Sequence, residues 1–315
     1  MKKTLRPILP PSSWPEEAQR LYWDFADFVN QGRTGARAYL GQLASFFKYQ
    51  EEQDLGFREL PTSLITSYVE KSSVYNRPSV MSTVRLWLRF LYRRRQLLSP
   101  LHQEIPQYPV IRRRRPLLTH PQVLQVLGLP PLDEPLGIRD RAFLELAYAS
   151  GMRRSELGAL TLGDVDTSAW RIHIGQAKNN YQRTVPMTRQ AREFLLLYLR
   201  EARPQLTSPL SLNALWLGHA GIRLHPNQMG IRLKHLYRVQ ETLGFPMTLH
   251  QLRHSVATHL LTEGADLRSV QELLGHLNIE STKTYTHITP ARLRQVHQHC
   301  HPRNQPGDFD FSGNF

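Results

Sequence analysis

Apolar residues recur at helical spacing through the first third of the chain. They do so at Ala38, Tyr39, Leu43, Phe46 and Phe47, and again at Met81, Val84, Leu86, Leu88, Phe90 and Leu91. Residues three and four positions apart lie on one face of a helix, which can then pack against a core. The pattern predicts an all-helical N-terminal domain over residues 1–98.

A basic, proline-rich stretch follows from residue 99 to 116. Its prolines are Pro100, Pro106, Pro109 and Pro116, and its run of four arginines is Arg112, Arg113, Arg114 and Arg115. Proline disfavours helix at the residue before it, so this spacing predicts an extended linker between two domains. A run of arginines is typical either of a solvated surface or of a segment that contacts phosphates, and we favour phosphate contact.

Helical spacing resumes in residues 117–303, which we predict to form a second, mostly helical domain. Thr119 is suited to cap its first helix, and Gly151 to end the second. In residues 167–187, apolar and polar residues instead alternate on both sides of a polar turn. Alternation with a period of two around a turn predicts a β-hairpin. The predicted fold class is therefore mainly α, with a small β-hairpin or sheet.

The C-terminal part of this domain contains further helix signals. Thr248 and Gln251 have the spacing of a capping box, and Asp266 can cap the helix that follows. A third helix would carry Tyr285. Residues 304–315 show no periodicity, so we predict a flexible tail.

The charge of the chain is strongly positive. Lys and Arg number 40 against 26 for Asp and Glu, which gives a formal charge of +14 and a pI of about 10.2. This balance favours a polyanionic partner, nucleic acid before an anionic membrane. No apolar stretch reaches the roughly 18 residues of a spanning helix, and the N-terminus lacks the apolar run of a signal peptide. We therefore expect a cytoplasmic protein. Cys300 is the only cysteine, which excludes an intrachain disulfide.

An ordered set of polar residues is spread through the second domain. It comprises Arg153 after Gly-Met, Lys178 in the hairpin turn, His250 and Arg253 in a His-x-x-Arg motif, His276 after Leu-Gly, and Tyr285 nine residues later. Each residue alone has an ordinary structural explanation, but the set in this order resembles the tyrosine recombinases of the phage integrase family. The resemblance runs from about residue 119 to residue 303. It is nearest to the Xer recombinases, because the sequence YTHITPARLRQVHQHCHPR is similar to their C-terminal helix.

The resemblance implies an enzyme that cuts and rejoins DNA, with Tyr285 as its nucleophile. A helical, SAM-like core-binding domain would precede the catalytic domain. The products of cleavage would be a 3′-phosphotyrosine and a 5′ hydroxyl, which keep the energy of the broken bond, so we expect no ATP, metal or other cofactor. The chain accordingly has no Gly-x4-Gly-Lys-Ser/Thr loop and no tight acidic cluster typical of a two-metal nuclease.

The residue types suit this reaction. Arg153 and Arg253 can stabilise the charge that gathers on phosphate oxygens, because guanidiniums stay charged and give bidentate hydrogen bonds. His250 and His276 would add polar contacts, and His250 could accept the tyrosine proton. A lysine whose pKa is lowered by a cationic site could protonate the departing 5′ oxygen, and the resemblance assigns this role to Lys178.

Some of these assignments have competitors in the sequence. Arg154 could replace Arg153, although the Gly-apolar-Arg register favours Arg153. Lys283 or Arg183 could replace Lys178.

Glu156 and the pair of His250 and His254 need separate interpretations. Glu156 would oppose a phosphate, so we expect it to orient an arginine instead. His250 and His254 have the four-residue spacing of a zinc pair, but the HExxH glutamate and paired cysteines are missing, so we disfavour a metal site.

The resemblance also implies partners. These are double-stranded DNA and further subunits, of this chain or a paralogous recombinase, in a tetramer that exchanges strands between two sites through a Holliday junction. The helix ARLRQVHQHC would dock on a neighbouring subunit, and accessory proteins could join the assembly.

Three other functions stay open at this point. They are a mobile-element integrase rather than a resolver of replicon dimers, a type IB topoisomerase, and a catalytically silent DNA-binding regulator. The intact residue set argues against the regulator, and the Xer-like C-terminal sequence against the topoisomerase.

Overall fold

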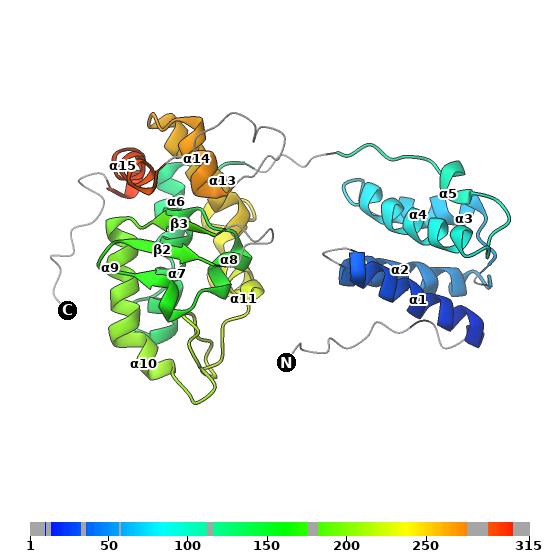
Figure 1. The fold of residues 1–315 in the computed structure, drawn as a ribbon, viewed down its shortest axis with the longest axis horizontal. Coiled ribbons are helices and arrows are strands. Elements are labelled where there is room, and N and C mark those ends of the chain that lie inside the picture. Colours follow the sequence, from blue (N-terminus) through cyan, green and yellow to red (C-terminus); the bar gives the residue numbers. More distant parts are fainter. Residues whose placement is uncertain are drawn as a thin grey trace. The chain divides into compact units, whose positions relative to one another are not determined.

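The computed structural model describes residues 10, 14–32, 36–56, 58–111, 116–175, 182–275 and 289–304. The chain divides into two compact units, Met1–Arg114 and Arg115–Phe315 (Figure 1). Each unit has its own hydrophobic core. Among the described residues, no helix is both long enough and apolar enough to cross a membrane.

The first unit is built from helices alone. They are α1 (Glu16–Gly32), α2 (Ala36–Glu52), α3 (Thr62–Lys71), α4 (Arg77–Arg93) and the short α5 (Leu101–Glu104). Aromatic rings fill the core between α1, α2 and α4: Phe25 and Phe47 pack edge-on against Trp87, at 5.1 Å and 5.4 Å between ring centroids. Burying such large apolar side chains is the main stabilising contribution here. The predicted helical character of this part of the chain is confirmed.

Part of the stretch that the prolines predict to be extended is helical and folds onto the first unit. Helix α5 contacts α4, and Ile105, which follows it, is only 3% exposed. Arg85 on α4 donates hydrogen bonds to the carbonyl oxygens of Ile105 and Pro106 at 2.9 Å and 3.0 Å. An apolar side chain and two anchored carbonyls thus hold this segment, whereas Arg112–Arg115 lie outside the described residues.

The second unit contains more helices and a small sheet. The helices are α6 (His120–Leu127), α7 (Pro135–Ser150), α8 (Arg154–Ala159), α9 (Arg189–Leu197), α10 (Arg203–Leu206), α11 (Pro226–Ile231), α12 (Val239–Leu243), α13 (Leu249–Thr262), α14 (Leu267–Leu274) and α15 (Pro290–Cys300). The strands are β1 (Val165–Asp166), β2 (Arg171–Ile174) and β3 (Arg183–Pro186). Short 3-10 or π-helical segments lie at Leu162–Asp164, Tyr198–Ala202, Arg232–Leu236 and Pro302–Asn304.

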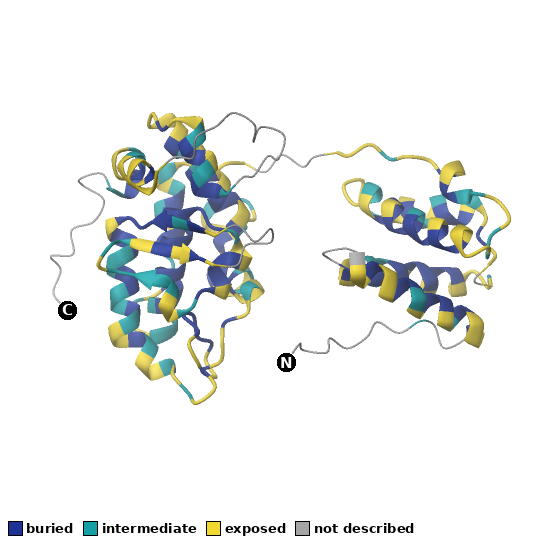
Figure 2. Cartoon of the chain, in the orientation of Figure 1, coloured by how far each residue is buried: buried dark blue, intermediate teal, exposed yellow. Residues whose placement is uncertain are grey.

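Helix α7 runs through the centre of the second unit and is buried on nearly every side (Figure 2). It contacts α6, α9, α13 and β3. A helix covered all round needs partners for its charged residues, and α7 has them: Arg139 pairs with Asp140 at 2.6 Å, and Glu145 pairs with Arg303 at 2.7 Å. The C-terminal end of α7 leads directly into Gly151 and Arg153.

The predicted hairpin is confirmed, and a third strand extends it to an antiparallel sheet in the order β1-β2-β3. Ile172 pairs with Val185 and Ile174 with Arg183. The two isoleucines and Val185 point into the core, as the alternation predicts. Arg183 occupies an inward position as well and is 8% exposed, although arginine is rarely buried.

The helix ends lie where the sequence signals predict them. Thr119 and Gln122 form a capping box before α6, and Thr248 and Gln251 form another before α13. Gly151 ends α7 in the left-handed conformation, at a φ of +57°. Local side-chain chemistry therefore sets the boundaries of the helices that surround the site.

Candidate active site

Gly151 fixes the position of the loop between α7 and α8. Its positive φ favours glycine, and a Cβ there would lie 2.7 Å from Leu274 Cδ2 and 3.2 Å from Val256 Cγ1. The close approach brings the end of α7 against α13 and α14. The carbonyl oxygen of Gly151 then accepts a hydrogen bond from Nη1 of Arg253.

Arg253 lies in α13 and is 4% exposed. Its Nη2 donates to the carbonyl oxygen of Leu274 at 2.7 Å, so the side chain links α7 to the end of α14. Burial, together with the nearby charge of Arg153, lowers the pKa of Arg253 to about 10. Arg253 therefore stays a cation at neutral pH.

Arg153 is the residue that precedes α8, and its side chain is 42% exposed. Nη1 donates to Glu156 Oε1 at 2.9 Å, and Nη2 donates to the carbonyl oxygen of Gly275 at 3.1 Å. The guanidinium is thus fixed on one side and open to solvent on the other. Arg154, its competitor in the sequence, is exposed as the first residue of α8.

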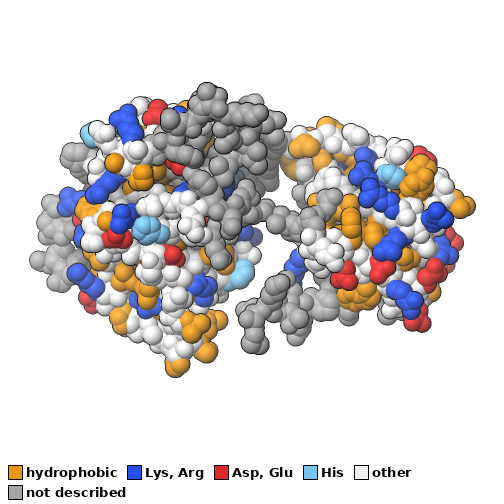
Figure 3. All heavy atoms as spheres, viewed as in Figure 1, with side chains coloured by type: hydrophobic (Ala, Val, Ile, Leu, Met, Phe, Trp, Pro, Cys, Tyr) orange, Lys and Arg blue, Asp and Glu red, His pale blue; other side chains and the backbone are white. Residues whose placement is uncertain are grey.

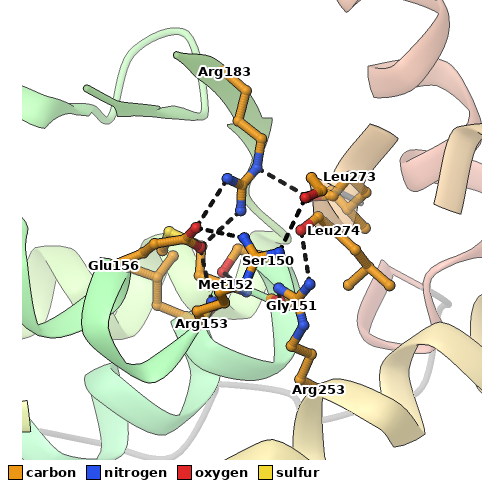
Figure 4. Close-up of polar contacts among 11 residues, drawn as sticks. Ser150, Gly151, Met152, Arg153, Glu156, Arg183, Arg253, Leu273 and Leu274 are labelled. Carbon is orange, nitrogen blue, oxygen red and sulfur yellow. Dashed lines mark hydrogen bonds and ion pairs between the residues drawn. The ribbon is translucent and has the colours of Figure 1, made fainter. Parts of the chain in front are cut away.

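Glu156 is a buried carboxylate held by two arginines (Figure 4). Arg183 Nη2 donates to its Oε2 at 2.8 Å, and the backbone N–H of Arg153 donates to the same oxygen at 2.9 Å. Burial alone would raise the pKa of Glu156, but the hydrogen bonds from Arg183 and Arg153 lower it to about 2. Glu156 is therefore ionised and fixes both guanidiniums.

The C-terminus of α14 is the point where the arginines meet. Three consecutive carbonyl oxygens each accept a hydrogen bond from a different arginine: Leu273 from Arg183 Nε at 3.3 Å, Leu274 from Arg253, and Gly275 from Arg153. The last carbonyls of a helix have no partners inside it and carry its negative dipole end, so cations are stabilised there. The three guanidiniums come from β3, α13 and the start of α8.

His250 lies on α13, one turn before Arg253, and is exposed. Its Nε2 is 2.9 Å from Nε2 of His254, so one of the two rings donates to the other. The described part of the chain has no group of three or more His, Cys, Asp or Glu residues that could hold a metal ion.

Several residues that the sequence singles out lie outside the described residues. They are Lys178, His276, Tyr285, the linker arginines Arg112–Arg115, the alternative Lys283, and the tail from residue 305. The structure thus brings together Arg153, Arg253 and Glu156, with His250 on the same helix as Arg253. Helix α14 ends at Leu274, and the described residues stop at Gly275, one residue before His276.

The structural role of Arg183 is not apparent from the sequence, in which it counts only as an alternative to Lys178. The available signal is its position: in the alternating strand it takes a place that points inward. A buried guanidinium needs acceptors inside the protein, and Glu156 supplies them with both of its carboxylate oxygens.

On the face visible in Figure 3, basic side chains stand beside acidic ones over both units. The formal charge of +14 therefore does not gather into one uniform patch on that face. The cations placed at the candidate site are distinguished by their fixed geometry rather than by their number.

Comparison with known proteins identifies the class. Residues 116–292, which hold all of these candidate residues except the linker arginines Arg112–Arg115, match the phage integrase family. The chain belongs to this family, whose members are the tyrosine recombinases, enzymes that break and rejoin DNA.

Sequence relatives place the chain in one group within this family. The chain is 38% identical over 287 residues to the tyrosine recombinase XerC of Mycobacterium sp. (strain JLS), covering 85% of this chain and 92% of that protein. The fold is similar to the XerH site-specific recombinase bound to palindromic difH substrate, with a TM-score of 0.60, 18% identity, and coverage of 92% and 90%. It is also similar to a lambda integrase tetramer bound to a Holliday junction, with a TM-score of 0.61, 15% identity, and coverage of 86% and 80%. The chain is thus a XerC-like enzyme of site-specific DNA recombination.

Proposed function

We propose that Tyr285 cuts one DNA strand by attacking the phosphorus of a phosphodiester. The tyrosine oxygen forms a bond to phosphorus while the bond from phosphorus to the 5′ oxygen breaks. The strand is then held as a 3′-phosphotyrosine, and the 5′ oxygen leaves as a hydroxyl. A second 5′ hydroxyl reverses the reaction on a new strand, so no external energy source is required.

The convergence of Arg153 and Arg253 carries this proposal. Their guanidiniums bind adjacent carbonyl oxygens, those of Gly275 and Leu274, immediately before His276 in the chain. Each guanidinium has five N–H donors, more than the two bonds described for its terminal nitrogens, so a phosphate oxygen can be bound in addition. Two fixed cations would stabilise the charge that develops on the nonbridging oxygens during attack.

The site has the electrostatics that such a phosphate needs. Arg253 is charged at neutral pH in spite of its lowered pKa, and Glu156 is neutralised by two arginines rather than directed at the substrate. Because the pKa of a tyrosine is near 10, attack at neutral pH benefits from the surrounding cations and from a base.

The remaining roles follow from the chemistry of the side chains. His250 would contact the phosphate and accept the proton of Tyr285, and His276 would donate a further hydrogen bond to a phosphate oxygen. Lys178 would protonate the departing 5′ oxygen. These assignments depend on the order of the residues in the chain and on the position of His250 one helical turn before Arg253.

We further propose that the chain binds duplex DNA and assembles as a tetramer on two sites. The lambda integrase whose fold it shares is a tetramer bound to a Holliday junction, and the XerH recombinase is bound to its difH substrate. Helix α15 has Leu293 and His297 buried within its own unit, so contact with a neighbouring subunit would use its exposed face. The arginine-rich linker would contact the DNA backbone.

A nicked suicide substrate tests the central step. Such a DNA loses a short 5′ hydroxyl fragment after cleavage, so the covalent complex cannot reverse. The protein should form an adduct that survives denaturing electrophoresis, and Tyr285→Phe should bind the same DNA but form none. An undiminished adduct with Tyr285→Phe would overturn the assignment of the nucleophile.

A further inference from the structure

Arg183 is a buried arginine that joins α8 to the end of α14, the two elements whose residues also bind Arg153. Its side chain is 4% exposed, and it extends from β3 toward α8 and α14 (Figure 4). Nη1 and Nη2 donate to the two carboxylate oxygens of Glu156 at 3.2 Å and 2.8 Å, and Nε donates to the carbonyl oxygen of Leu273 at 3.3 Å. All three nitrogens of the guanidinium therefore have partners inside the protein.

This geometry separates Arg183 from the arginines that can touch DNA. Arg153 exposes 42% of its side chain, whereas Arg183 exposes 4%. Arg253 is buried as well, but its described hydrogen bonds use only Nη1 and Nη2, whereas all three nitrogens of Arg183 donate to protein acceptors. Arg183 therefore acts on the reaction through its neighbours rather than by contact with a phosphate. One neighbour, Glu156, in turn holds the guanidinium and the backbone N–H of Arg153.

The second neighbour is the end of α14. A Cβ on Gly275 would lie 2.8 Å from Nη1 and 2.9 Å from Cζ of Arg183, so the guanidinium occupies the space that a side chain at this position would take. The contact fixes the helix end at Leu273 and Gly275. From there the chain continues into His276 and, nine residues later, Tyr285.

We propose that Arg183 is a positioning residue for strand cleavage. It acts through Glu156 on the guanidinium of Arg153, and through the carbonyl oxygen of Leu273 on the helix end that precedes His276. This inference rests on the proposed function, because it assigns the phosphate contact to Arg153. The hydrogen bonds at all three nitrogens of Arg183 also argue against Arg183 as the alternative to Lys178 for the proton donor.

The fork of the guanidinium is essential to this role. A lysine has one nitrogen and no planar fork, so it cannot hold both oxygens of Glu156 and the carbonyl of Leu273 together. Arg183→Lys would keep the charge beside Glu156 but lose the link to α14. Arg183→Gln would lose both and leave Glu156 with Arg153 as its only cationic partner among the contacts described.

The test measures single-turnover cleavage of the nicked suicide substrate at saturating protein, beside DNA affinity and thermal stability. Arg183→Gln should lower the cleavage rate about 10- to 100-fold with little change in DNA affinity, because displacing a catalytic group by a fraction of its contact distance affects the transition state most. The cleavage rate of Arg183→Lys should lie between that of Arg183→Gln and that of the unchanged protein. Arg139→Gln, which breaks a buried pair with Asp140 away from the site, is the matched control and should lower stability but not the rate below its melting temperature.

A second substrate distinguishes positioning from general destabilisation. A methylphosphonate at the scissile position lacks the negative charge that Arg153 would neutralise. The reduction in cleavage rate caused by Arg183→Gln, relative to the unchanged protein, should therefore be much smaller on this DNA. A reduction equal on both substrates would overturn the proposal. So would a normal rate in Arg183→Gln or, where that variant does not fold, in Arg183→Lys. Failure of the proposed function is a separate outcome, in which the unchanged protein itself forms no adduct.

A double variant tests the path through Glu156. If Arg183 acts through this carboxylate, Arg183→Gln and Glu156→Gln together should slow cleavage by less than the product of their separate effects. Fully multiplicative effects would contradict the path from Arg183 through Glu156 to Arg153.

Discussion

Nε2 of His297 donates a hydrogen bond of 2.8 Å to the carbonyl oxygen of Ala149. Ala149 lies near the end of α7, two residues before Gly151, and His297 is buried near the end of α15. The bond therefore fastens the helix that follows Tyr285 in the chain to the helix that leads into Arg153. His301 is buried beside it, with its Nε2 at 3.3 Å from the carbonyl oxygen of Tyr148.

Because these two histidines are buried, we predict that the free energy of unfolding decreases in mild acid. Burial lowers the pKa of His297 to about 4, and burial together with the nearby His297 lowers the pKa of His301. Both are neutral in the folded protein but take up a proton on unfolding once the pH is below their ordinary pKa of about 6.5. The contribution of these groups to the free energy of unfolding is therefore fully present above pH 6.5. It decreases as the pH falls toward 4, by about 1.4 kcal/mol per pH unit for each group.

Calorimetry of the second unit's transition between pH 7 and pH 5 measures this effect. His297→Asn, which keeps a donor but does not titrate, should make the pH dependence less steep. His299→Gln, on the exposed side of the same helix, should leave it unchanged. An equal pH dependence in the His297 variant and the unchanged protein would show that His297 does not titrate on unfolding.

Gly275→Ala should destabilise the protein more than Gly264→Ala. Both glycines have positive φ, +65° and +87°, so alanine is strained at either position. Only at Gly275 does the added Cβ meet another group, the guanidinium of Arg183 at 2.8 Å, while Gly264 has open space. We expect a cost of about 1 kcal/mol at Gly264 and a larger one at Gly275, measured as shifts of the urea midpoint. Equal costs would argue against close packing between Gly275 and Arg183.

The adjacent arginines at the start of α8 offer a matched pair. Arg153→Gln should lower the rate of adduct formation by about 100-fold or more, as expected when one preorganised donor to the developing charge is lost. Arg154→Gln should form the adduct at a rate within a few fold of that of the unchanged protein, because Arg154 is exposed at the first position of α8. The reverse order of effects would transfer the phosphate contact to Arg154.

Neutralising Arg112–Arg115 together should weaken binding to all DNA sequences alike. The reason is counterion release: the slope of log affinity against log salt is negative, and each lost phosphate contact makes it less steep by about 0.9. Titration at several salt concentrations, on specific and unrelated duplexes, measures both quantities. A change confined to sequence preference, with the slope unaltered, would contradict phosphate contact by the linker.

Local signals in the sequence were sufficient to predict much of the second unit. The capping boxes at Thr119 and Thr248, the left-handed Gly151 and the alternation around Ile172 each depend on residues close together in the chain. Interactions of this kind are encoded within a few positions, which is why the helix ends and the hairpin could be placed without a structure.

Buried polar contacts between distant segments could not be predicted in the same way. The sequence around α15 is rich in Arg, His and Gln and has the composition of a solvated helix, yet His297, His301 and Arg303 are buried. Arg303 is buried because Glu145, 158 residues earlier, accepts two hydrogen bonds from it. The contact of Arg183 with Glu156 is of the same type, since only the folded chain brings β3 beside α8.

The most direct test of the account is to identify the covalent bond between protein and DNA. The adduct formed on a suicide substrate can be digested with protease and nuclease and analysed by mass spectrometry, with the strand on each side of the cleaved bond labelled in turn. We predict a nucleotide attached through its 3′ phosphate to Tyr285, and a released fragment with a 5′ hydroxyl. Attachment to another residue, or through a 5′ phosphate, would contradict the account.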